Sequence, residues 1–351
     1  MARYDAKRIR DLVVKILVCE KMSEEDAQIT ADALMDANLC GRDSHGFLRI
    51  GNYVERLRKG GTKADARPEI VKETAVSALI DGKGAMGIVA AHEAAMVCRK
   101  KALENGMAFI LVRNGGHYGA GGYWGEQIGQ DDLIVMNMTN TEALVVPFGG
   151  KDIALGTNPI TIYVPANKYP GILYDVATST IAQGKLFDYK LRNKELPPGC
   201  AVDEEGRETT DPEKALYLTS FGGHKGYGLA VMIEAMTACL SGNGIGKEIR
   251  SLNVETDKIN NVSYCFWAMR TDLFGTEDAF RSNVDHLIEY LHATPAADGK
   301  KVYYPGEIEF TNRNENLIRG IDIPSNLEKN LTAIAKEDGI HSPESFFCPV
   351  N

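Results

Sequence analysis

The pattern of apolar residues changes near residue 70, and this change restricts the chain to folds that join a helical part to a sheet. Before that point, Ile9, Leu12, Val13, Ile16 and Leu17 have the spacing that places one apolar stripe on a helix. After it, short β-prone runs alternate with Gly-rich turns. The sequence therefore predicts an α/β or α+β protein whose first segment is helical.

Further elements follow from local signals. Ser23, three residues before Asp26, resembles a capping box and predicts a helix that ends near Gly41. The expected strands are Val76–Ile80, Ala108–Val112, Leu133–Met138, Ile160–Val164, Ile172–Asp175 and Asn261–Met269. The expected helices are Ile50–Lys59, Val89–Glu104, Tyr123–Gly129, Gly228–Leu240, Thr276–His292 and a last one from Pro324, which we expect to pack on the N-terminal helices.

Charge and cysteine content exclude several classes of protein. The net charge of -9 argues against non-specific binding to nucleic acid or to a membrane surface, since both need basic patches. The apolar run 12–18 is too short to span a membrane, so we expect a cytoplasmic protein. The 7 cysteines contain no Cys-x-x-Cys pair, which disfavours a disulfide framework and a zinc knuckle.

The segment from Asp43 to Arg49 carries the first candidate site. It places His45 four residues before Arg49, so that the two side chains would share one face of a helix. Ser44 and Gly46 resemble a helix start, whose free N–H groups favour an anion. An Arg fork grips a carboxylate bidentately, and a His transfers protons near neutral pH. The alternative is a surface pair of two side chains that repel each other.

Two more residues stand in Gly-rich surroundings. His117 follows a predicted strand, and neighbouring glycines leave its imidazole open to a ligand; the alternative is a loop or capping histidine. Lys225 stands where a Gly-rich stretch enters an apolar helix, and it can hold a pyrophosphate or a carboxylate there. The alternative for Lys225 is a surface lysine, and the spacing of a P-loop is absent.

Other motifs fail on inspection. Gly82–Gly87 matches G-x-G-x-x-G, but the acidic residue expected after the next strand is missing, so we interpret it as an ordinary strand-to-helix turn. His92-Glu93 lacks the second His of a zinc protease, and no metal site is expected. The chain also has no Gly-x-Ser-x-Gly elbow, which weighs against a serine hydrolase.

Six motifs in one order then carry a resemblance. They are Asp-Ser-His-Gly-x-x-Arg at 43–49, Gly-Gly-His-x-Gly at 115–119, Val-Val-Pro-Phe-Gly-Gly at 145–150, Gly-Thr-Asn-Pro at 156–159, Asp-Val-Ala-Thr-Ser at 175–179 and Lys-Gly-Tyr-Gly-Leu at 225–229. Over about residues 5–340 the chain resembles the malate/L-lactate dehydrogenase family that is unrelated to the Rossmann-type enzymes. The resemblance implies an α+β fold with a non-Rossmann nicotinamide-binding sheet domain at 71–294. A helical domain, 1–70 with 295–351, would come from both chain termini.

The resemblance also implies roles for individual residues. His117 and His45 would be catalytic, with His117 as the acid/base, and the substrate would be bound by Arg49, Ser44 and Tyr53. The residues implied in cofactor binding are Thr141, Asp175, Val176, Ala177, Lys225, Asn283 and Asp285. The cofactor would be NAD, with NADP not excluded. A homodimer or a dimer of dimers is expected, with a small 2-hydroxy acid as substrate.

Within the family, three segments favour similarity to the enzymes that oxidise (S)-ureidoglycolate to oxalurate. They are 145–150, 55–62 and 294–306. Thr141-Glu142-Ala143 departs from the Ser-Asp-Pro of those enzymes, which leaves malate, L-lactate and sulfolactate open as substrates. A protein of another class, which binds a nucleotide or an organic acid without catalysis, is the remaining alternative.

Overall fold

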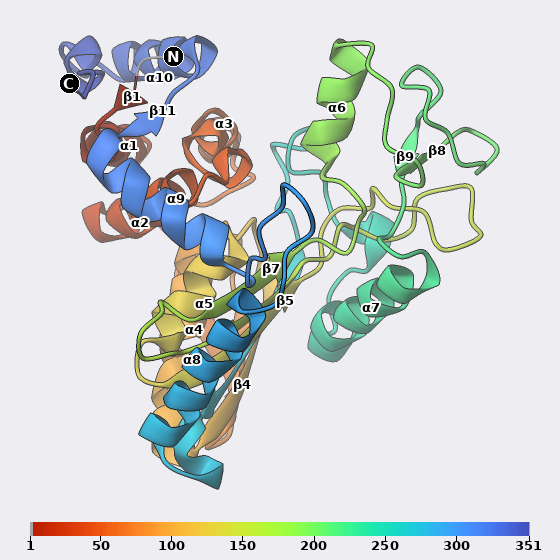
Figure 1. Ribbon diagram of the computed structural model, residues 1–351. Coiled ribbons are helices and arrows are strands. Elements are labelled where there is room, and N and C mark those ends of the chain that lie inside the picture. The colour runs from red at the N-terminus through yellow and green to blue at the C-terminus, as the bar shows by residue number, and fades with distance from the viewer. Residues whose placement is uncertain (1–2, 351) are drawn as a thin grey trace.

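The computed structural model describes residues 3–350, and the helices of both chain ends form one layer of the molecule (Figure 1). These helices are α1 (Ala6–Cys19), α2 (Glu24–Leu39), α3 (Ile50–Lys59), α9 (Glu307–Arg319) and α10 (Ser325–Glu337). The short strand β1 (Arg3–Tyr4) pairs antiparallel with β11 (Ile321–Asp322), which fastens the two ends of the chain together. The prediction that the last helix packs on the first ones is confirmed, since Leu327 and Leu331 share a core with Ile9 and Leu12.

A seven-stranded mixed sheet forms the centre of the protein. Its strands are β2 (Glu69–Glu73), β3 (Ser77–Asp81), β4 (Met107–Gly115), β5 (Leu133–Thr139), β6 (Ile160–Val164), β7 (Ile172–Val176) and β10 (Val262–Arg270), in the order β2-β3-β4-β10-β5-β6-β7. Within the described residues, β3–β4 is the one parallel pair of this sheet. A doubly wound Rossmann sheet is parallel throughout its core, so the predicted non-Rossmann α+β fold is confirmed.

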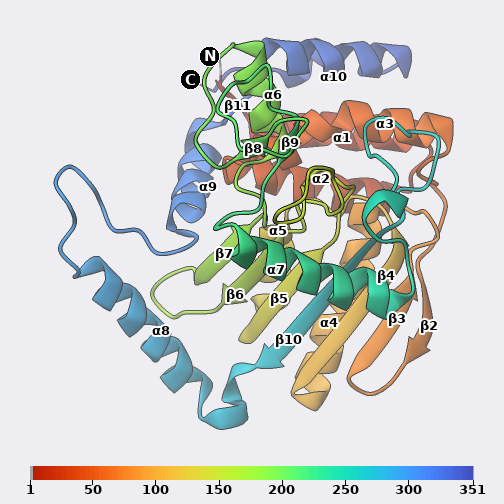
Figure 2. The same cartoon turned by 90° about the vertical axis from the view of Figure 1, so that its right-hand side faces the viewer.

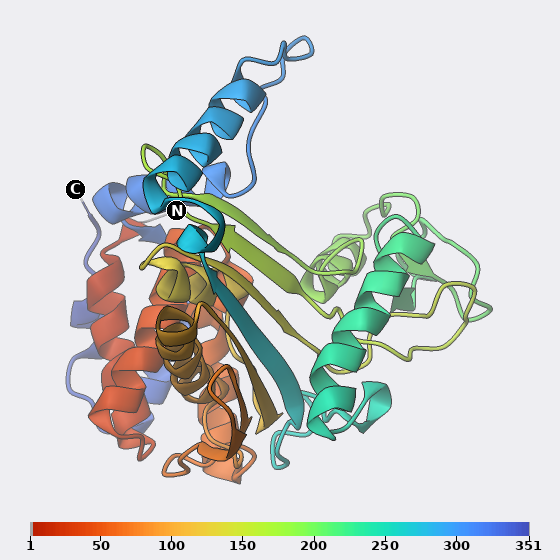
Figure 3. The ribbon, with the colours of Figure 1, turned by 90° about the horizontal axis from the view of Figure 1, so that it is seen from below.

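Helices cover both faces of the sheet (Figures 2 and 3). On one face, α4 (Gly87–Asn105) and α5 (Gly121–Gly129) lie between the sheet and the terminal helices. On the other face lies α7 (His224–Glu234), which continues as a π-helical turn over Ala235–Cys239. The helix α8 (Glu277–His292) packs beside the β7 edge through Val284 and Ile288.

One apolar core connects the terminal helices with the covered face of the sheet. Ile16 of α1, Leu34 of α2, Ala94 of α4 and Phe266 of β10 are buried in the same cluster. The predicted helical domain (1–70 with 295–351) and the predicted sheet domain (71–294) therefore share one apolar core. That these two parts are separate domains stays a prediction.

Several elements have no clear signal in the sequence. The polar segment between Thr294 and Pro324, for which no element was predicted, contains α9, of which only Phe310 is fully buried. An excursion between β7 and α7 contains α6 (Gln183–Leu191), β8 (Ala201–Val202) and β9 (Tyr217–Leu218), which pack on a small core of their own. Such elements lack the wide apolar stripe from which a helix or strand is recognised.

No helix among residues 3–350 combines the length and the apolar composition needed to cross a bilayer. The motif Gly82–Gly87 is the turn from β3 into α4, as interpreted from the sequence.

Candidate active site

The segment 43–49 does not form the helix start that its sequence suggested. Two short 3₁₀ turns, Asp43–His45 and Phe47–Arg49, are separated by Gly46, and the α-helix begins only at Ile50. The expectation that His45 and Arg49 share one helical face is therefore wrong. Gly46 breaks the pattern because its φ of -94° and ψ of -149° are far from helical values.

Asn38, at the end of α2, holds this segment in place. Its side-chain oxygen accepts a hydrogen bond from Phe47 N at 2.8 Å, and its amide donates to Asp43 Oδ1 at 2.7 Å. A Cβ atom on Gly46 would lie 2.1 Å from Asn38 Oδ1. The glycine of the motif is thus required for a close approach, and Asn38 is a supporting residue that the sequence reasoning missed.

Tyr53, His117 and His45 come together between α3 and the end of β4. The Tyr53 hydroxyl lies 2.7 Å from His117 Nδ1, and the imidazoles of His45 and His117 are stacked with their centroids 5.5 Å apart. Ser44 Oγ lies 2.9 Å from His45 Nδ1. Tyr53 is only 2% exposed, whereas both imidazoles are half-buried. These four residues, which the sequence placed in one site, therefore form one cluster.

The glycine motif at the start of α4 supports the His117 loop. A Cβ atom on Gly87 would lie 2.2 Å from His117 O and 2.4 Å from Gly116 C. Real Cβ atoms do not approach backbone so closely, so only glycine permits this contact. The G-x-G-x-x-G match thus has a packing role beside a site residue.

The guanidinium of Arg49 lies close enough to the same cluster that, besides burial, its charge lowers the pKa of both His45 and His117. Its Nε donates to Ser44 O at 2.6 Å, which fixes the plane of the side chain. Within residues 3–350, its two Nη groups have no hydrogen-bond acceptor and no carboxylate partner. A guanidinium held in this way presents a free fork, the arrangement that binds a carboxylate bidentately.

The electrostatic setting keeps both histidines neutral. Burial, with a smaller contribution from the charges of Arg49 and Arg42, lowers the pKa of His45 to about 4. Burial, the charge of Arg49 and the neighbouring His45 hold the pKa of His117 well below its usual value. Burial raises the pKa of Tyr53, so its hydroxyl keeps its proton. Both imidazoles are therefore neutral at pH 7 and have a lone pair for a proton, but the depressed pKa makes each a weaker base than a free histidine.

A second cluster lies where β5 and β7 end and β6 begins. Thr141 Oγ1 accepts from Thr157 N at 2.9 Å, and Thr178 N donates to Thr157 O at 2.8 Å, directly after Val176 and Ala177. A Cβ atom on Gly156 would lie 2.1 Å from Thr141 Oγ1. The structure thus brings together Thr141, Val176 and Ala177, which were predicted to contact the cofactor.

A network of buried hydrogen bonds holds this second cluster in place. Glu234 of α7 accepts hydrogen bonds from Asn140 Nδ2 at 3.1 Å, Asn158 Nδ2 at 2.8 Å and Gly246 N at 3.0 Å. Asn158 in turn accepts from Thr141 N at 3.1 Å. A signal for this network existed in the sequence, because Glu234 is the one acidic residue in the apolar run 228–240.

Lys225 lies at the N-terminus of α7, near the second cluster. The turn before it is tied to that cluster, since Phe221 N donates to Thr178 O at 2.9 Å. Lys225 is exposed, and among residues 3–350 no carboxylate lies within ion-pair distance of it. Its charge is therefore available to an anionic ligand.

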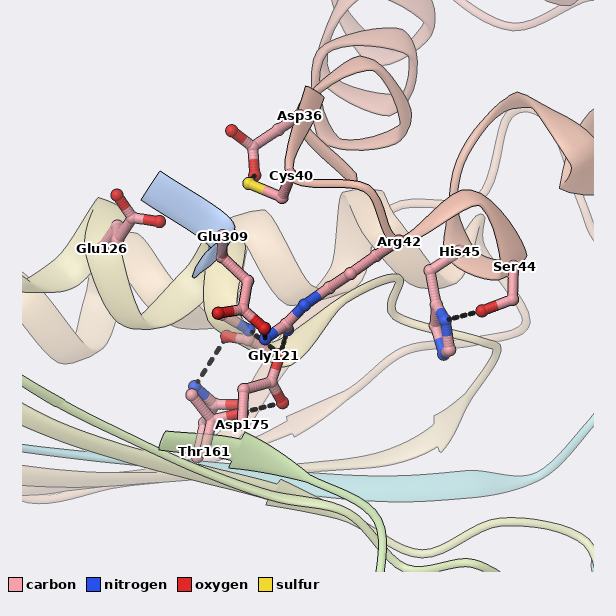
Figure 4. A network of polar contacts seen from close by, with 12 residues as sticks. Asp36, Cys40, Arg42, Ser44, His45, Gly121, Glu126, Thr161, Asp175 and Glu309 are labelled. Atoms are coloured by element: carbon pink, nitrogen blue, oxygen red, sulfur yellow. Dashed lines mark hydrogen bonds and ion pairs between the residues drawn. The ribbon is translucent and has the colours of Figure 1, made fainter. Parts of the chain in front are cut away.

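The other predicted cofactor residues have different surroundings. The Asp175 carboxylate is engaged inside the protein, since it accepts from Thr161 Oγ1 at 2.7 Å and pairs with Arg42 (Figure 4). Asp285 is buried on α8 and accepts from Lys168 N at 3.0 Å, whereas Asn283 is exposed on the same helix. Both residues belong to α8, the helix beside the β7 edge (Figure 2).

A search of residues 3–350 finds no group of three His, Cys, Asp or Glu side chains placed to hold a metal ion.

Comparisons with known proteins match this fold and these motifs over nearly the whole chain. The sequence profile described as malate/L-lactate dehydrogenase matches residues 4–332. The L-sulfolactate dehydrogenase of Methanocaldococcus jannaschii is 37% identical over 334 residues, which cover 95% of this chain and 96% of that one. The solved structure of sulfolactate dehydrogenase from that organism has a TM-score of 0.93, with 36% identity, 98% of this chain covered and 99% of that one.

Two further relatives carry other substrate names. The malate/(S)-sulfolactate dehydrogenase of Methanothermus fervidus is 37% identical over 330 residues, covering 93% of this chain and 96% of the relative. The ureidoglycolate dehydrogenase (NAD(+)) of Escherichia coli is 31% identical over 334 residues, covering 95% of this chain and 96% of the relative.

The protein is thus an oxidoreductase that acts on a CH–OH group, and a hydroxy-acid dehydrogenase in particular. The chain belongs to the malate/L-lactate dehydrogenase family, as the sequence motifs predicted. Dehydrogenases of this family use nicotinamide cofactors.

Proposed function

We propose that the protein oxidises a 2-hydroxy acid to a 2-oxo acid with NAD or NADP, using His117 as the base. The observation that carries this proposal is the contact of Tyr53 with His117 Nδ1, next to the free fork of Arg49. It leaves His117 Nε2 as the nitrogen that faces a ligand. A proton acceptor and a carboxylate clamp side by side match the two ends of a C1–C2 hydroxy-acid unit.

The proposed role of His117 as the base requires one of its two tautomers. For Nε2 to accept the hydroxyl proton, Nδ1 must carry a hydrogen and donate it to the Tyr53 oxygen. The same hydrogen bond persists when Nε2 has taken up the proton, because both nitrogens then donate. Tyr53 is therefore an acceptor for both protonation states of His117, and its buried position keeps the ring fixed.

Arg49 and His45 orient the acid. The two Nη groups of Arg49 would hold the C1 carboxylate, which places the C2 hydroxyl toward His117. His45 has Nδ1 engaged with Ser44, so its Nε2 is free to bond the same hydroxyl or the carboxylate. The bound carboxylate also offsets the charge of Arg49, one of the causes that lower the pKa of His117.

The second cluster suits a nicotinamide dinucleotide. The hydroxyls of Thr141 and Thr157 lie 3.4 Å apart beside the close-packed Gly156, where they can bond a polar ligand, and the unpaired Lys225 suits a pyrophosphate. Thr141, Val176, Ala177 and Lys225 would hold the cofactor, which supplies a hydride acceptor when bound. The choice between NAD and NADP, the dimer and the cytoplasmic location stay predictions.

Two substrate classes differ in the group beyond C2. The relatives at 37% identity are named for sulfolactate and malate, so an acid with a second anionic group is our first candidate. Ureidoglycolate, which the turn segments favoured, is the second candidate, since Glu142 departs from the Asp of the ureidoglycolate enzymes but keeps a carboxylate at that position. This half-buried carboxylate stands near Arg49 and Arg56, where it can accept N–H bonds and would repel a second anion.

The test is reduction of NAD and of NADP with (S)-malate, (S)-sulfolactate, (S)-ureidoglycolate and (S)-lactate in turn. The highest kcat/KM for malate or sulfolactate supports the first candidate, and the highest for ureidoglycolate supports the second. A preference for lactate contradicts both candidates but keeps the hydroxy-acid oxidation. No reduction with any acid would reject that oxidation and favour a protein that only binds.

His117→Asn tests the assignment of the base. We expect kcat to fall about 10²–10⁴-fold, because the proton acceptor is lost. The Kd of NADH, measured by its fluorescence, should stay within twofold of the wild type. An unchanged kcat would show that another group takes the proton.

A further inference from the structure

Arg42 lies between two parts of the site, the segment 43–49 and the segment 175–177, which are far apart in the sequence. It follows α2 and directly precedes the turn that carries Ser44 and His45, and its N–H donates to Ala37 O at 2.7 Å. Its side chain extends away from α2 toward the sheet (Figure 4). There the guanidinium pairs with Asp175 of β7 and, through Nη2, with Glu309 Oε1 of α9 at 3.2 Å.

The oxygens of the Asp175 carboxylate are occupied by hydrogen bonds and an ion pair within the protein. Besides Arg42, it accepts from Gly122 N at 2.9 Å and from Thr161 Oγ1 at 2.7 Å, and its side chain is only 9% exposed. An acidic residue that binds a ribose needs an oxygen open to the ligand. The side chain of Asp175 therefore has another task than the cofactor contact that was predicted for it, while Val176 and Ala177 directly after it remain available.

We propose that Arg42 is a positioning residue that locks the substrate segment 43–49 to the cofactor segment 175–177 through its ion pair with Asp175. This inference rests on the proposed function, since it concerns how the same two ligands are held in register. Glu309 brings the C-terminal helix α9 into the same contact. The pair thereby aligns three parts of the chain, two of which carry predicted ligand contacts.

Geometry explains why a guanidinium is needed here. A fork can contact Asp175 with one Nη and Glu309 with the other, which fixes its direction as well as its distance. A lysine would offer one charged nitrogen to two carboxylates on different elements. The charge of Arg42 also contributes to the low pKa of His45, which shows how near the pair lies to the catalytic cluster.

A nearby ion pair of similar burial serves as a control, because it distinguishes a positioning role from a contribution to stability alone. Arg313 of α9 pairs with Glu126 of α5 and Asp36 of α2, and its side chain is 21% exposed against 20% for Arg42. Both arginines line one small cavity between α2, α5 and α9. The Arg313 pair, however, contacts neither the segment 43–49 nor the segment 175–177. Its loss should cost stability alone.

The first experiment compares Asp175→Asn with Glu126→Gln, two carboxylate-to-amide changes of similar shape. We expect Asp175→Asn to speed amide hydrogen exchange in residues 43–49 at least fivefold, although the substitution lies on β7. Glu126→Gln should leave that segment unchanged. Equal exchange of 43–49 in wild type and Asp175→Asn would overturn the proposal. Hydrogen exchange is measured without turnover, so it tests the positioning role even if the protein does not catalyse the proposed oxidation.

The second experiment uses the acid and cofactor that the wild type turns over best. Arg42→Gln should lower kcat/KM for the acid and for the cofactor, each at least tenfold, and Arg42→Lys should lie between it and the wild type. Arg313→Gln should lower the Tm as much but keep both kcat/KM values within twofold. If Arg313→Gln loses as much kcat/KM as Arg42→Gln, the Arg42 pair has only a structural role.

Discussion

At the scale of single residues, the site is built from pairs of side chains that contact each other. The Tyr53 hydroxyl contacts Nδ1 of His117, Ser44 contacts both His45 and Arg49, and Asn38 holds the turn between them. The sequence shows the residue types of such pairs but not the partners, since Tyr53 and His117 are 64 positions apart.

The Tyr53 contact predicts the behaviour of Tyr53→Phe. Without the acceptor for Nδ1–H, the useful tautomer and orientation of His117 are less populated, so we expect kcat to fall about ten- to hundredfold. The loss of the acceptor also disfavours the imidazolium, so the acidic limb of the kcat/KM profile should move to lower pH. The measurement is the pH profile of both kinetic parameters.

Tyr118→Phe is the matched control for this change. The hydroxyl of Tyr118 is also buried and donates to Asn137 Oδ1 at 3.0 Å, without touching an imidazole. We expect its removal to lower the Tm but to leave kcat within twofold. If Tyr53→Phe behaves in the same way, Tyr53 does not set the state of His117.

At the scale of elements, backbone contacts place the loops that carry these side chains. Periodicity and turn residues predicted six strands of the large sheet and the helices that flank them. They did not predict the 3₁₀ turns at 43–49, because these depend on the close approach of Gly46 to Asn38. Such approaches join residues of different elements, so no local pattern encodes them.

Gly87→Ala tests one such approach. The new methyl group would meet the backbone at Gly116 and His117, which cannot yield as a flexible side chain does. We expect a loss of about 1–3 kcal/mol in the free energy of unfolding, as for other overpacked sites. Displacement of the His117 loop should also lower kcat/KM at least about tenfold.

Gly228→Ala provides the comparison. Gly228 lies in the first turns of α7, and no atom lies within 4 Å of the place that a Cβ atom would take there, so alanine should be neutral or stabilising. Denaturant unfolding and steady-state kinetics of both variants decide the matter. Wild-type kcat/KM in Gly87→Ala would show that the contact does not position His117.

At the scale of the whole molecule, the sheet order follows from long-range pairing that no motif reveals. The strand β10 lies between β4 and β5, although the excursion with α6, β8 and β9 and the helix α7 separate it from β5 along the chain. Only the resemblance to a family implied the non-Rossmann sheet and the helical layer from both termini. Residue patterns alone left α/β and α+β open, because the β3–α4–β4 unit is locally the same in both.

The two histidines of the site also make the stability of the whole protein depend on pH. Their pKa values are lowered on folding, to about 4 for His45 and well below the usual value for His117. The unfolded chain, with histidine pKa values near ~6.5, therefore binds more protons than the folded one below that pH. The two imidazoles therefore leave the free energy of unfolding unchanged above about pH 6.5 and lower it as the pH falls from there toward 4.

We therefore expect the Tm of the ligand-free wild type to fall between pH 7.5 and pH 5.5 by more than that of His45→Gln. Each half-buried imidazole contributes at most about 1.4 kcal/mol per pH unit below ~6.5, so the two proteins should differ by on the order of 1–2 °C. His341→Gln, at an exposed position after α10, should follow the wild type. Parallel curves for wild type and His45→Gln would show that His45 is protonated as readily in the folded protein as in the unfolded chain. That result would remove the electrostatic basis for a neutral imidazole pair at the centre of the site.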